Sequence, residues 1–175
     1  LSVKTERGEI RIRDLVEGDV SVVTEEAGST LERVSGRVEL DSTAGAVHIK
    51  DLDGSATVRS GTGNVTLELS HGSFAVRTNA GAIRLFDVGG SFDLESESGS
   101  IRGSSIEITE NSRVRSKHGE IEIDVSTPQR ALRYRLSSER GALYLGALKA
   151  RGNLRFGSGS TLVTAVSQSG DIHFY

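Results

Sequence analysis

Cysteine, methionine and tryptophan are absent from this 175-residue chain, and proline occurs once. Without cysteine the chain can form neither a disulfide framework nor a thiolate metal site. Its apolar runs extend over only a few residues, far short of the roughly 20 that a membrane-spanning helix needs. The sequence therefore predicts no disulfide-stapled fold and no membrane-spanning segment.

Charge and the N-terminal sequence narrow the possible functions further. The net charge is -3 and the pI about 5.8, with both signs interspersed along the chain, so no surface for nucleic acid is predicted. No signal peptide is visible. Because the chain opens at Leu1 rather than Met, we expect any export signal or anchor to lie outside this sequence.

Glycine, in contrast, is abundant, and the 21 glycines recur at a fixed interval. A first column, with a spacing of 18 residues, contains Gly18, Gly36, Gly54, Gly72 and Gly90. A second column starts with the same spacing and then becomes irregular; it contains Gly45, Gly63, Gly81, Gly99, Gly119, Gly141 and Gly170. A hydroxyl side chain lies three residues before each glycine of the second column, and an aliphatic one lies two residues after it. A sustained period of this length is typical of stacked repeat proteins.

The segments between the glycines alternate apolar and polar residues, as in Val65-Thr-Leu-Glu-Leu, which indicates strands with one buried face. The Ser/Thr-x-x-Gly motif between them is turn chemistry. An antiparallel meander would pair unlike strands, whereas a parallel solenoid places each residue over its equivalent in the next coil. The aligned columns therefore favour the solenoid.

We predict an all-β fold, a single-domain parallel β-solenoid (β-helix) over residues 1–175 with about nine coils of ~18 residues each. Right-handed winding is expected by analogy with parallel crossovers. Residues 1–103 are predicted to form regular coils. Residues 104–175 are predicted to form irregular, insertion-bearing coils, because the glycine spacing lengthens after Gly99 and Pro128 suits a loop.

The repeated pattern of an aliphatic residue, Ser/Thr-x-x-Gly and then alternating aliphatic residues, seen also in Ser169-Gly170-Asp171-Ile172, resembles the bacterial Toastrack family. Its members are also described as adhesin-like β-solenoids, and the resemblance covers essentially the whole chain. It implies an envelope-associated, extracytoplasmic, non-enzymatic domain. It also implies an interaction role beside membrane-stress components of the Lia and phage-shock type. The family defines no catalytic residues, so none is carried over to this chain.

Candidate catalytic and metal-binding residues are few. The four histidines, His48, His71, His118 and His173, fall in separate places of the repeat and predict no shared metal. Asp51, Asp53 and Asp87 lie near the glycine turns, and Glu95 and Glu97 flank Ser96, but no convergence of six oxygens is apparent. The hydroxyl column continues the buried phase, so we interpret it as turn capping rather than as an exposed binding array. No catalytic residue, metal site or cofactor is predicted.

Outward positions supply the one candidate partner surface. Arg59 and Arg77 occupy one column and Arg84 and Arg102 another, and the four would form a small basic patch if the two columns approached each other. Opposite charges such as Asp41 and Arg59 are expected to pair across coils. The favoured function is a non-enzymatic, adhesin-like envelope module that binds a protein or glycan partner. The alternatives are a polysaccharide-acting β-helix enzyme and a scaffold that self-associates end to end.

Overall fold

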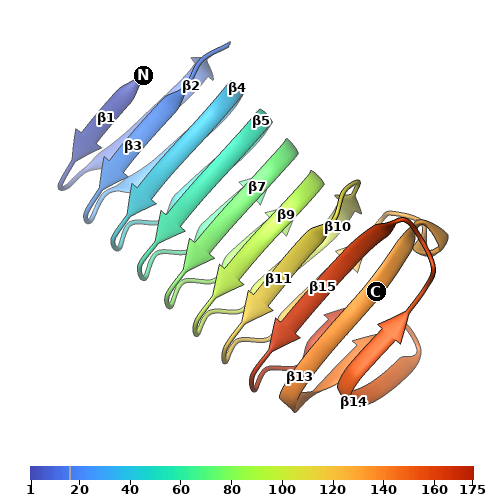
Figure 1. The fold of residues 1–175 in the computed structure, drawn as a ribbon. Helices are drawn as coiled ribbons and strands as arrows, with labels where there is room; N and C mark the ends of the chain where they lie inside the picture. The colour runs from blue at the N-terminus through green and yellow to red at the C-terminus, as the bar shows by residue number, and fades with distance from the viewer. Residues whose placement is uncertain (16) are drawn as a thin grey trace.

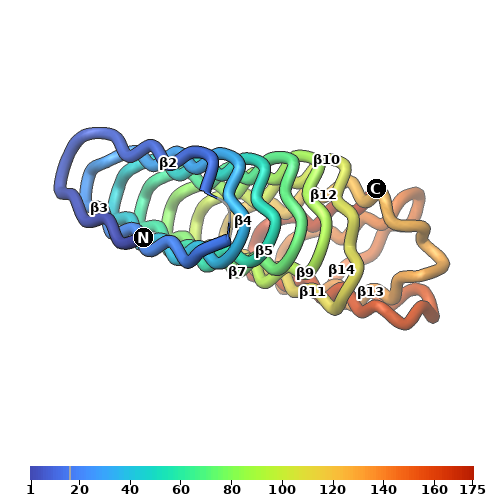
Figure 2. The backbone as a smooth tube through the Cα atoms, turned by 90° about the horizontal axis from the view of Figure 1, so that it is seen from above, coloured from blue at the N-terminus to red at the C-terminus, as the bar shows by residue number. Residues whose placement is uncertain are grey.

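The computed structural model describes residues 1–15 and 17–175, with 69% of residues in strands and 2% in helix. The strands stack along one axis as successive coils of a solenoid, seen from the side in Figure 1 and from above in Figure 2. Among the described residues every strand pairing is parallel except that of β13 (Leu132–Leu145) with β14 (Leu148–Phe156). The predicted all-β parallel solenoid is confirmed.

Each coil contributes one strand segment to each of two faces, which we call the first face and the second face. Strands confined to the first face are β1 (Ser2–Thr5), β3 (Val20–Thr24), β7 (His71–Thr78), β9 (Gly89–Ser96), β11 (Ser112–Ser116) and β15 (Thr161–Ser167). Strands confined to the second face are β2 (Glu9–Leu15), β6 (Val65–Glu68), β8 (Ile83–Phe86), β12 (Ile121–Val125) and β16 (Ile172–Phe174). Strands that bend from one face to the other are β4 (Gly28–Ser42), β5 (Val47–Ser60), β10 (Ile101–Ile108), β13 and β14.

The register places equivalent residues directly over one another. Gly36, Gly54, Gly72 and Gly90 pair in sequence across β4, β5, β7 and β9. At Gly54, with φ +147°, an added Cβ would lie 2.1 Å from the carbonyl oxygen of Gly36. The second column is equally tight, since a Cβ at Gly81 would lie 2.0 Å from the Gly63 oxygen. The glycine columns are therefore required by the close approach of neighbouring backbones.

A second kind of corner, which carries the first glycine column, joins the end of each second-face segment to the next first-face segment, and the sequence did not reveal its backbone conformation. In six successive coils a non-glycine residue has a positive φ there, between 49° and 57°, and in the first coil Glu17 has one as well. The six residues are Asp14, Arg33, Asp51, Leu69, Asp87 and Ser105. Aspartate tolerates this left-handed conformation better than most residues, which accounts for its frequency in the column.

Alternate side chains of both faces meet in one continuous core. Phe74 and Phe92, on adjacent coils, stack with ring centroids 5.8 Å apart. Tyr134 packs edge-on against Phe174 at 5.5 Å, and burial raises the pKa of its phenol. The narrow interior therefore holds like side chains stacked on like.

The number of turns differs from the prediction. The chain winds through about seven turns, not nine. After β12 the chain leaves the next level of the stack empty and forms β13 at the level beyond it. The empty level is filled later by β15 and β16. These strands pair with β11 and β12 on one side and with β13 on the other. The last two motif-bearing segments thus stack on the solenoid but do not continue its winding. The division into regular coils over residues 1–103 and irregular coils over residues 104–175 stays a prediction. The right-handed sense of the winding stays a prediction.

The end of the stack is closed by a segment that we call the cap, residues 129–156. It contains the 3-10 turn η1 (Gln129–Ala131), β13 and the antiparallel strand β14. Figure 1 shows β14 as the outermost strand at the C-terminal end, beyond β13. Pro128 precedes η1 in the loop that leads into the cap, as its lack of a backbone donor favours.

Candidate partner-binding face

The four arginines predicted as a partner surface lie in two pairs on opposite faces. Arg59 of β5 and Arg77 of β7 are in register on the first face. Arg84 of β8 and Arg102 of β10 are in register on the second face. The Ser/Thr-x-x-Gly turn between the two columns reverses the chain, so the columns cannot approach each other. The four arginines therefore do not form a joint patch, and a partner role for either pair stays a prediction.

Three of these arginines are engaged by carboxylates on neighbouring coils. Arg59 lies 3.5 Å from Asp41, which confirms the expected pair. Arg77 contacts both Asp93 and Glu95 of β9. Arg102 lies 3.4 Å from Glu122 and 3.6 Å from Glu120. Arg84 has no carboxylate within 4 Å among the described residues. Each of these exposed pairs contributes only about 0–1 kcal/mol, so their value lies in fixing the direction of the side chains.

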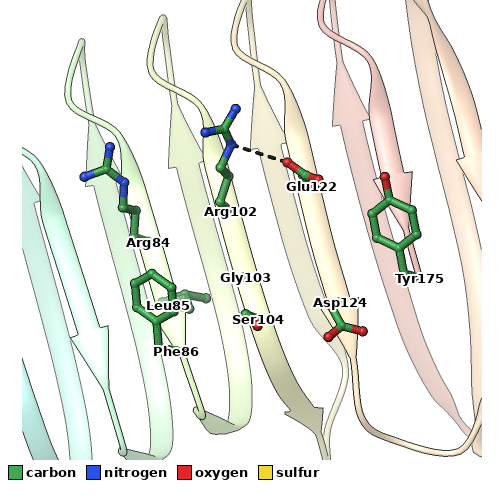
Figure 3. Close-up of a pocket in the computed structure, with 9 residues that line it drawn as sticks. All are labelled: Arg84, Leu85, Phe86, Arg102, Gly103, Ser104, Glu122, Asp124 and Tyr175. Atoms are coloured by element: carbon green, nitrogen blue, oxygen red, sulfur yellow. Dashed lines mark ion pairs between the residues drawn. The ribbon is translucent and has the colours of Figure 1, made fainter.

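A shallow hollow of about 380 Å³ lies on the second face beside Arg84 and Arg102. Figure 3 shows its floor at Gly103 and Ser104, with Phe86 on one side and Tyr175 on the other. Ser104 is the in-register neighbour of Phe86, so a small side chain follows a large one and leaves the depression. Phe86 is 43% exposed and Tyr175 is 59% exposed, which is unusual for side chains of this size.

Further aromatic rings continue the row toward the cap. Tyr144 and His173 stack with centroids 4.3 Å apart and planes 8° from parallel, and His173 lies 6.2 Å from the ring of Tyr175. Glu120 lies 3.4 Å from His173 Nε2, and Lys149 Nζ lies 5.1 Å from the centre of the Tyr144 ring. These contacts hold the rings in fixed orientations.

We call the set of Phe86, Tyr144, His173 and Tyr175, together with Arg84 and Arg102, the aromatic face. At a strand spacing of about 4.8 Å, it extends over roughly 20 Å of the solenoid axis from β8 to β13. Aromatic residues make up only 5% of the chain, and most of the exposed ones lie here. Tyrosine and arginine are the residue types that dominate binding energy at interfaces. The arrangement can stack against flat apolar surfaces while the guanidinium groups bind acceptor oxygens.

The hydroxyl column is buried, and most of its members cap turns, as the sequence predicts; the hydroxyl of Ser116 has no hydrogen-bond partner within the part of the chain that the structure describes. Ser60 Oγ donates to the Gly63 carbonyl at 2.8 Å, and Thr78 Oγ1 donates to the Gly81 carbonyl at 2.7 Å. In the last coils the same position accepts instead, since the Gly170 amide donates to Ser167 Oγ at 2.8 Å. These groups form no exposed array.

The candidate carboxylates stay dispersed along the solenoid. Asp51 and Asp87 line a groove at the corner together with His71 and Glu107, but Leu69 lies at the level between them. Two coil steps separate the two aspartates, or about 10 Å. Among residues 1–15 and 17–175, no three His, Asp or Glu side chains gather closely enough to hold a metal ion. Within the same residues, no helix has the length and hydrophobicity needed to cross a membrane.

Sequence reasoning missed most of the aromatic face. His173 was treated as an isolated surface residue, and Tyr144, Tyr175 and Phe86 were not singled out. The stacking of Tyr144 on His173 depends on β16 lying between β12 and β13, which sequence order does not indicate. The available signal was the scarcity of aromatic residues, because exposed positions occupied by a scarce residue type invite a functional explanation.

Comparison with known proteins gives one finding. A sequence model of the family described as Toastrack DUF4097 matches residues 1–174. The match includes every strand from β1 to β16, and so both the coils and the cap. Searches of curated proteins and of solved structures find no match.

Proposed function

The chain belongs to the Toastrack DUF4097 family, and from this premise we propose that it is a non-enzymatic, adhesin-like interaction module of the bacterial cell envelope. The family and the solenoid fold support a repeat interaction module. The partner is a protein or a glycan, and the module works outside the cytoplasm. Its surface for this partner is the aromatic face.

The observation that carries the proposal is a row of surface rings on one face of an otherwise aromatic-poor chain, in which Phe86 and Tyr175 are exposed and Tyr144 and His173 are half-buried. Phe86 and Tyr175 flank a hollow with a small-residue floor, and Arg84 is free of carboxylates there among the described residues. The two rings stand three strand steps apart, or about 14 Å, so a sugar ring or a planar peptide group can stack on either one and a longer ligand can reach both. The guanidinium of Arg84 is then available for a carboxylate or hydroxyl of the partner.

A non-catalytic role agrees with the placement of the acids. Glycoside hydrolysis uses two carboxyl groups about 5 to 10 Å apart on either side of the scissile bond. In the hollow, Glu122 is engaged by Arg102 at 3.4 Å, which leaves Asp124 as the acid free of an ion pair among the described residues. In the corner groove, Asp51 and Asp87 lie two coil steps apart with Leu69 at the level between them.

Binding to an array of bacterial envelope glycans and purified envelope proteins tests the proposal. We expect the double variant Phe86→Ala/Tyr175→Ala to lose at least about tenfold in affinity, since each ring contributes on the order of 1 kcal/mol or more. Val23→Ala/Val166→Ala is the matched control, because both valines are exposed on the first face. Equal binding by wild type and the aromatic variant would remove the aromatic face as the partner surface.

The non-enzymatic part has a separate test. Acidic and neutral polysaccharides are incubated with the protein, and newly formed reducing ends are measured over time. We expect no release above background. Release that disappears in Asp124→Asn, or in Asp51→Asn/Asp87→Asn, would establish the polysaccharide-acting alternative instead.

A further inference from the structure

Charge is distributed very unevenly between the cap and the rest of the molecule. The cap, residues 129–156, carries seven Lys or Arg side chains and one acid, Glu139, for a net charge of +6. The remaining residues carry fourteen Lys or Arg and twenty-three Asp or Glu, for a net charge of -9, which together with the cap gives the chain's -3. The positive side chains are Arg130, Arg133, Arg135, Arg140, Lys149, Arg151 and Arg155.

The cations of the cap are not used in ion pairs. Among the described residues, none of the seven lies within 4 Å of a carboxylate. The opposite end of the solenoid behaves differently: there Arg11 pairs with Glu9 at 2.9 Å and Arg7 pairs with Glu26 at 3.2 Å. Arginines at the N-terminal end thus have carboxylate partners within the chain, whereas the cations of the cap are left for something outside the chain.

The cations surround the end of the solenoid instead of lining one groove. Arg135 and Arg155 are in-register partners on the first face, where Arg133 also points outward. Lys149 pairs with Tyr144 and Arg151 with Ala142 on the second face. Positive charge therefore reaches the tip from both faces of the molecule.

Apolar side chains lie between these cations on β14, the outermost strand of the cap. None of the nine residues of β14 is buried. Leu148 is 42% exposed and Phe156 is 39% exposed, and they stand at the two ends of the strand, with the half-buried Leu154 and Ala150 between them. Exposed apolar residues rimmed by cations are typical of surfaces that bind other molecules or membranes.

Protection of a strand edge explains only part of this arrangement. Charged residues on an edge strand discourage pairing with other chains, but mixed charges achieve that equally well, as at β2. Edge protection also gives no reason to expose Leu148 and Phe156. A seven-to-one excess of cations around an apolar centre requires a negatively charged counterpart that can accept apolar groups.

We propose that the cap docks the solenoid onto an anionic phospholipid surface. Phospholipid headgroups supply phosphate for the arginines, and the interfacial region accepts the rings and aliphatic groups of Phe156 and Leu148. Each Lys or Arg near such a surface contributes about 1 kcal/mol, which converts to about fivefold in partitioning. A planar membrane fits cations spread around a tip, whereas a linear acidic glycan fits a continuous groove. The acidic coils, repelled by the same surface, point away from it.

This proposal concerns the tip of the rod and does not depend on the partner-binding role of the aromatic face; the two surfaces meet at Tyr144 of β13, but the variants that test them change different residues. It supplies an orientation in which the aromatic face stands perpendicular to the membrane. A variant of one surface should leave the other surface active. Failure of one proposal is thereby distinguishable from failure of the other.

The test is co-sedimentation of the whole chain with vesicles of phosphatidylglycerol and phosphatidylcholine in equal parts. We expect binding at low salt, loss of most binding at about 1 M salt, where the Debye length is about 3 Å, and little binding to pure phosphatidylcholine. The variant Arg135→Gln/Arg151→Gln/Arg155→Gln should bind roughly one hundred-fold more weakly, from about fivefold for each charge. The corresponding lysine variant should retain most of the binding.

Controls separate the cap from charge in general. Arg7→Gln/Arg11→Gln/Arg13→Gln removes the same charge at the opposite end and should bind vesicles nearly as well as wild type. Leu148→Ser/Phe156→Ser should weaken binding several-fold even at low salt. Phe86→Ala/Tyr175→Ala should bind vesicles normally.

Three results would overturn the proposal. One is equal sedimentation with neutral and anionic vesicles. Another is an equal loss of binding in the cap variant and in the N-terminal control. The third is binding of polygalacturonate, but not of vesicles, that the cap variant abolishes; the occupant of the cap would then be an acidic glycan. Circular dichroism of each variant confirms that the fold is intact before these results are compared.

Discussion

Gly170 lies directly over Gly119, so close that a Cβ added at Gly170 would be 2.1 Å from the Gly119 carbonyl oxygen. Gly141, although it precedes Gly170 in the sequence, lies one level further out, where an added Cβ would be 2.2 Å from the Gly170 carbonyl oxygen. The glycine column is therefore continuous in space while its sequence order is inverted at the end. This relationship fixes where the C-terminal strands insert.

Substitution of Gly170 by alanine tests that close contact. The Cβ would meet backbone atoms that cannot move without shifting a whole coil, so we expect a loss of about 3 kcal/mol in the free energy of unfolding, at the upper end of the range for overpacking. Urea denaturation followed by circular dichroism measures it. Gly28→Ala is the control, because its added Cβ would lie 3.8 Å from the nearest atom. Equal stability of the two variants would contradict the stacking of Gly170 on Gly119.

The hydroxyl of Thr78 provides a second test. It donates to the Gly81 carbonyl and lies 3.2 Å from Ser96 Oγ in the next coil. Thr78→Val keeps the shape but leaves buried acceptors without a donor, so we expect a loss of about 1–3 kcal/mol. Thr57→Val, on the outer surface of β5, should change stability by less than about 0.5 kcal/mol. A similar effect at both positions would mean that the turn-capping bond is not important.

Gly103 interrupts the aliphatic column, and the side chain of Ile106 fills the place that a larger residue would occupy. A Cβ at Gly103 would lie 2.7 Å from Ile106 Cγ1. We expect Gly103→Ala and Ile106→Ala each to destabilise the fold, and the double variant to lose less than the sum by about 0.5–3 kcal/mol. A double-mutant cycle from thermal or urea unfolding measures this coupling. Strict additivity would show that the two residues do not share the space.

The ion pair between Asp14 and Arg33 predicts a dependence on pH. Hydrogen bonding from the Arg33 guanidinium, with Nη2 3.1 Å from Oδ2, holds the pKa of the Asp14 carboxyl below its ordinary value of 3.8. The lowered pKa means that the pair stabilises the fold above pH 3.8 and that this contribution disappears as the pH falls through the lowered value.

Asp14→Asn isolates this contribution, because asparagine tolerates the same positive φ of 57°. The wild type should be slightly more stable than the variant at neutral pH. The difference should vanish in strong acid and shrink in about 1 M salt, since both side chains are exposed. Urea unfolding at several pH values measures it. A difference that grows on acidification would contradict the assigned direction.

Much of the fold follows from the sequence because parallel stacking repeats every side chain at the same position. The spacing of Gly45, Gly63, Gly81 and Gly99 gives the coil length, the register and the buried phase. The same regularity conceals the order of the last coils. Ser138 with Gly141 and Ser167 with Gly170 carry the same motif, so either coil satisfies the position above Gly119. Only the short connection through β14 and its antiparallel pairing with β13 decides between them.

The candidate site was less predictable for a related reason. Columns give neighbours along the solenoid axis, and the pairing of Arg59 with Asp41 was correctly predicted from them. They do not give neighbours that arise from a change in coil order, such as Tyr144 and His173. The positive charge of the cap was also not apparent, because the net charge of the whole chain is negative and the excess of cations emerges only when the bounds of the cap are known.

The insertion of β15 between β11 and β13, and of β16 between β12 and β13, has a consequence for vectorial synthesis. A nascent chain can wind its first seven turns as they leave the ribosome, each on the one before. When β13 and β14 emerge, the strands β15 and β16, with which β13 pairs in the folded protein, have not yet been synthesised. Residues 161–174 are synthesised last, so β15 and β16 must insert between strands that have already been made. If synthesis stops before these residues, the incomplete solenoid therefore ends in an unpaired strand edge that can pair with other nascent chains.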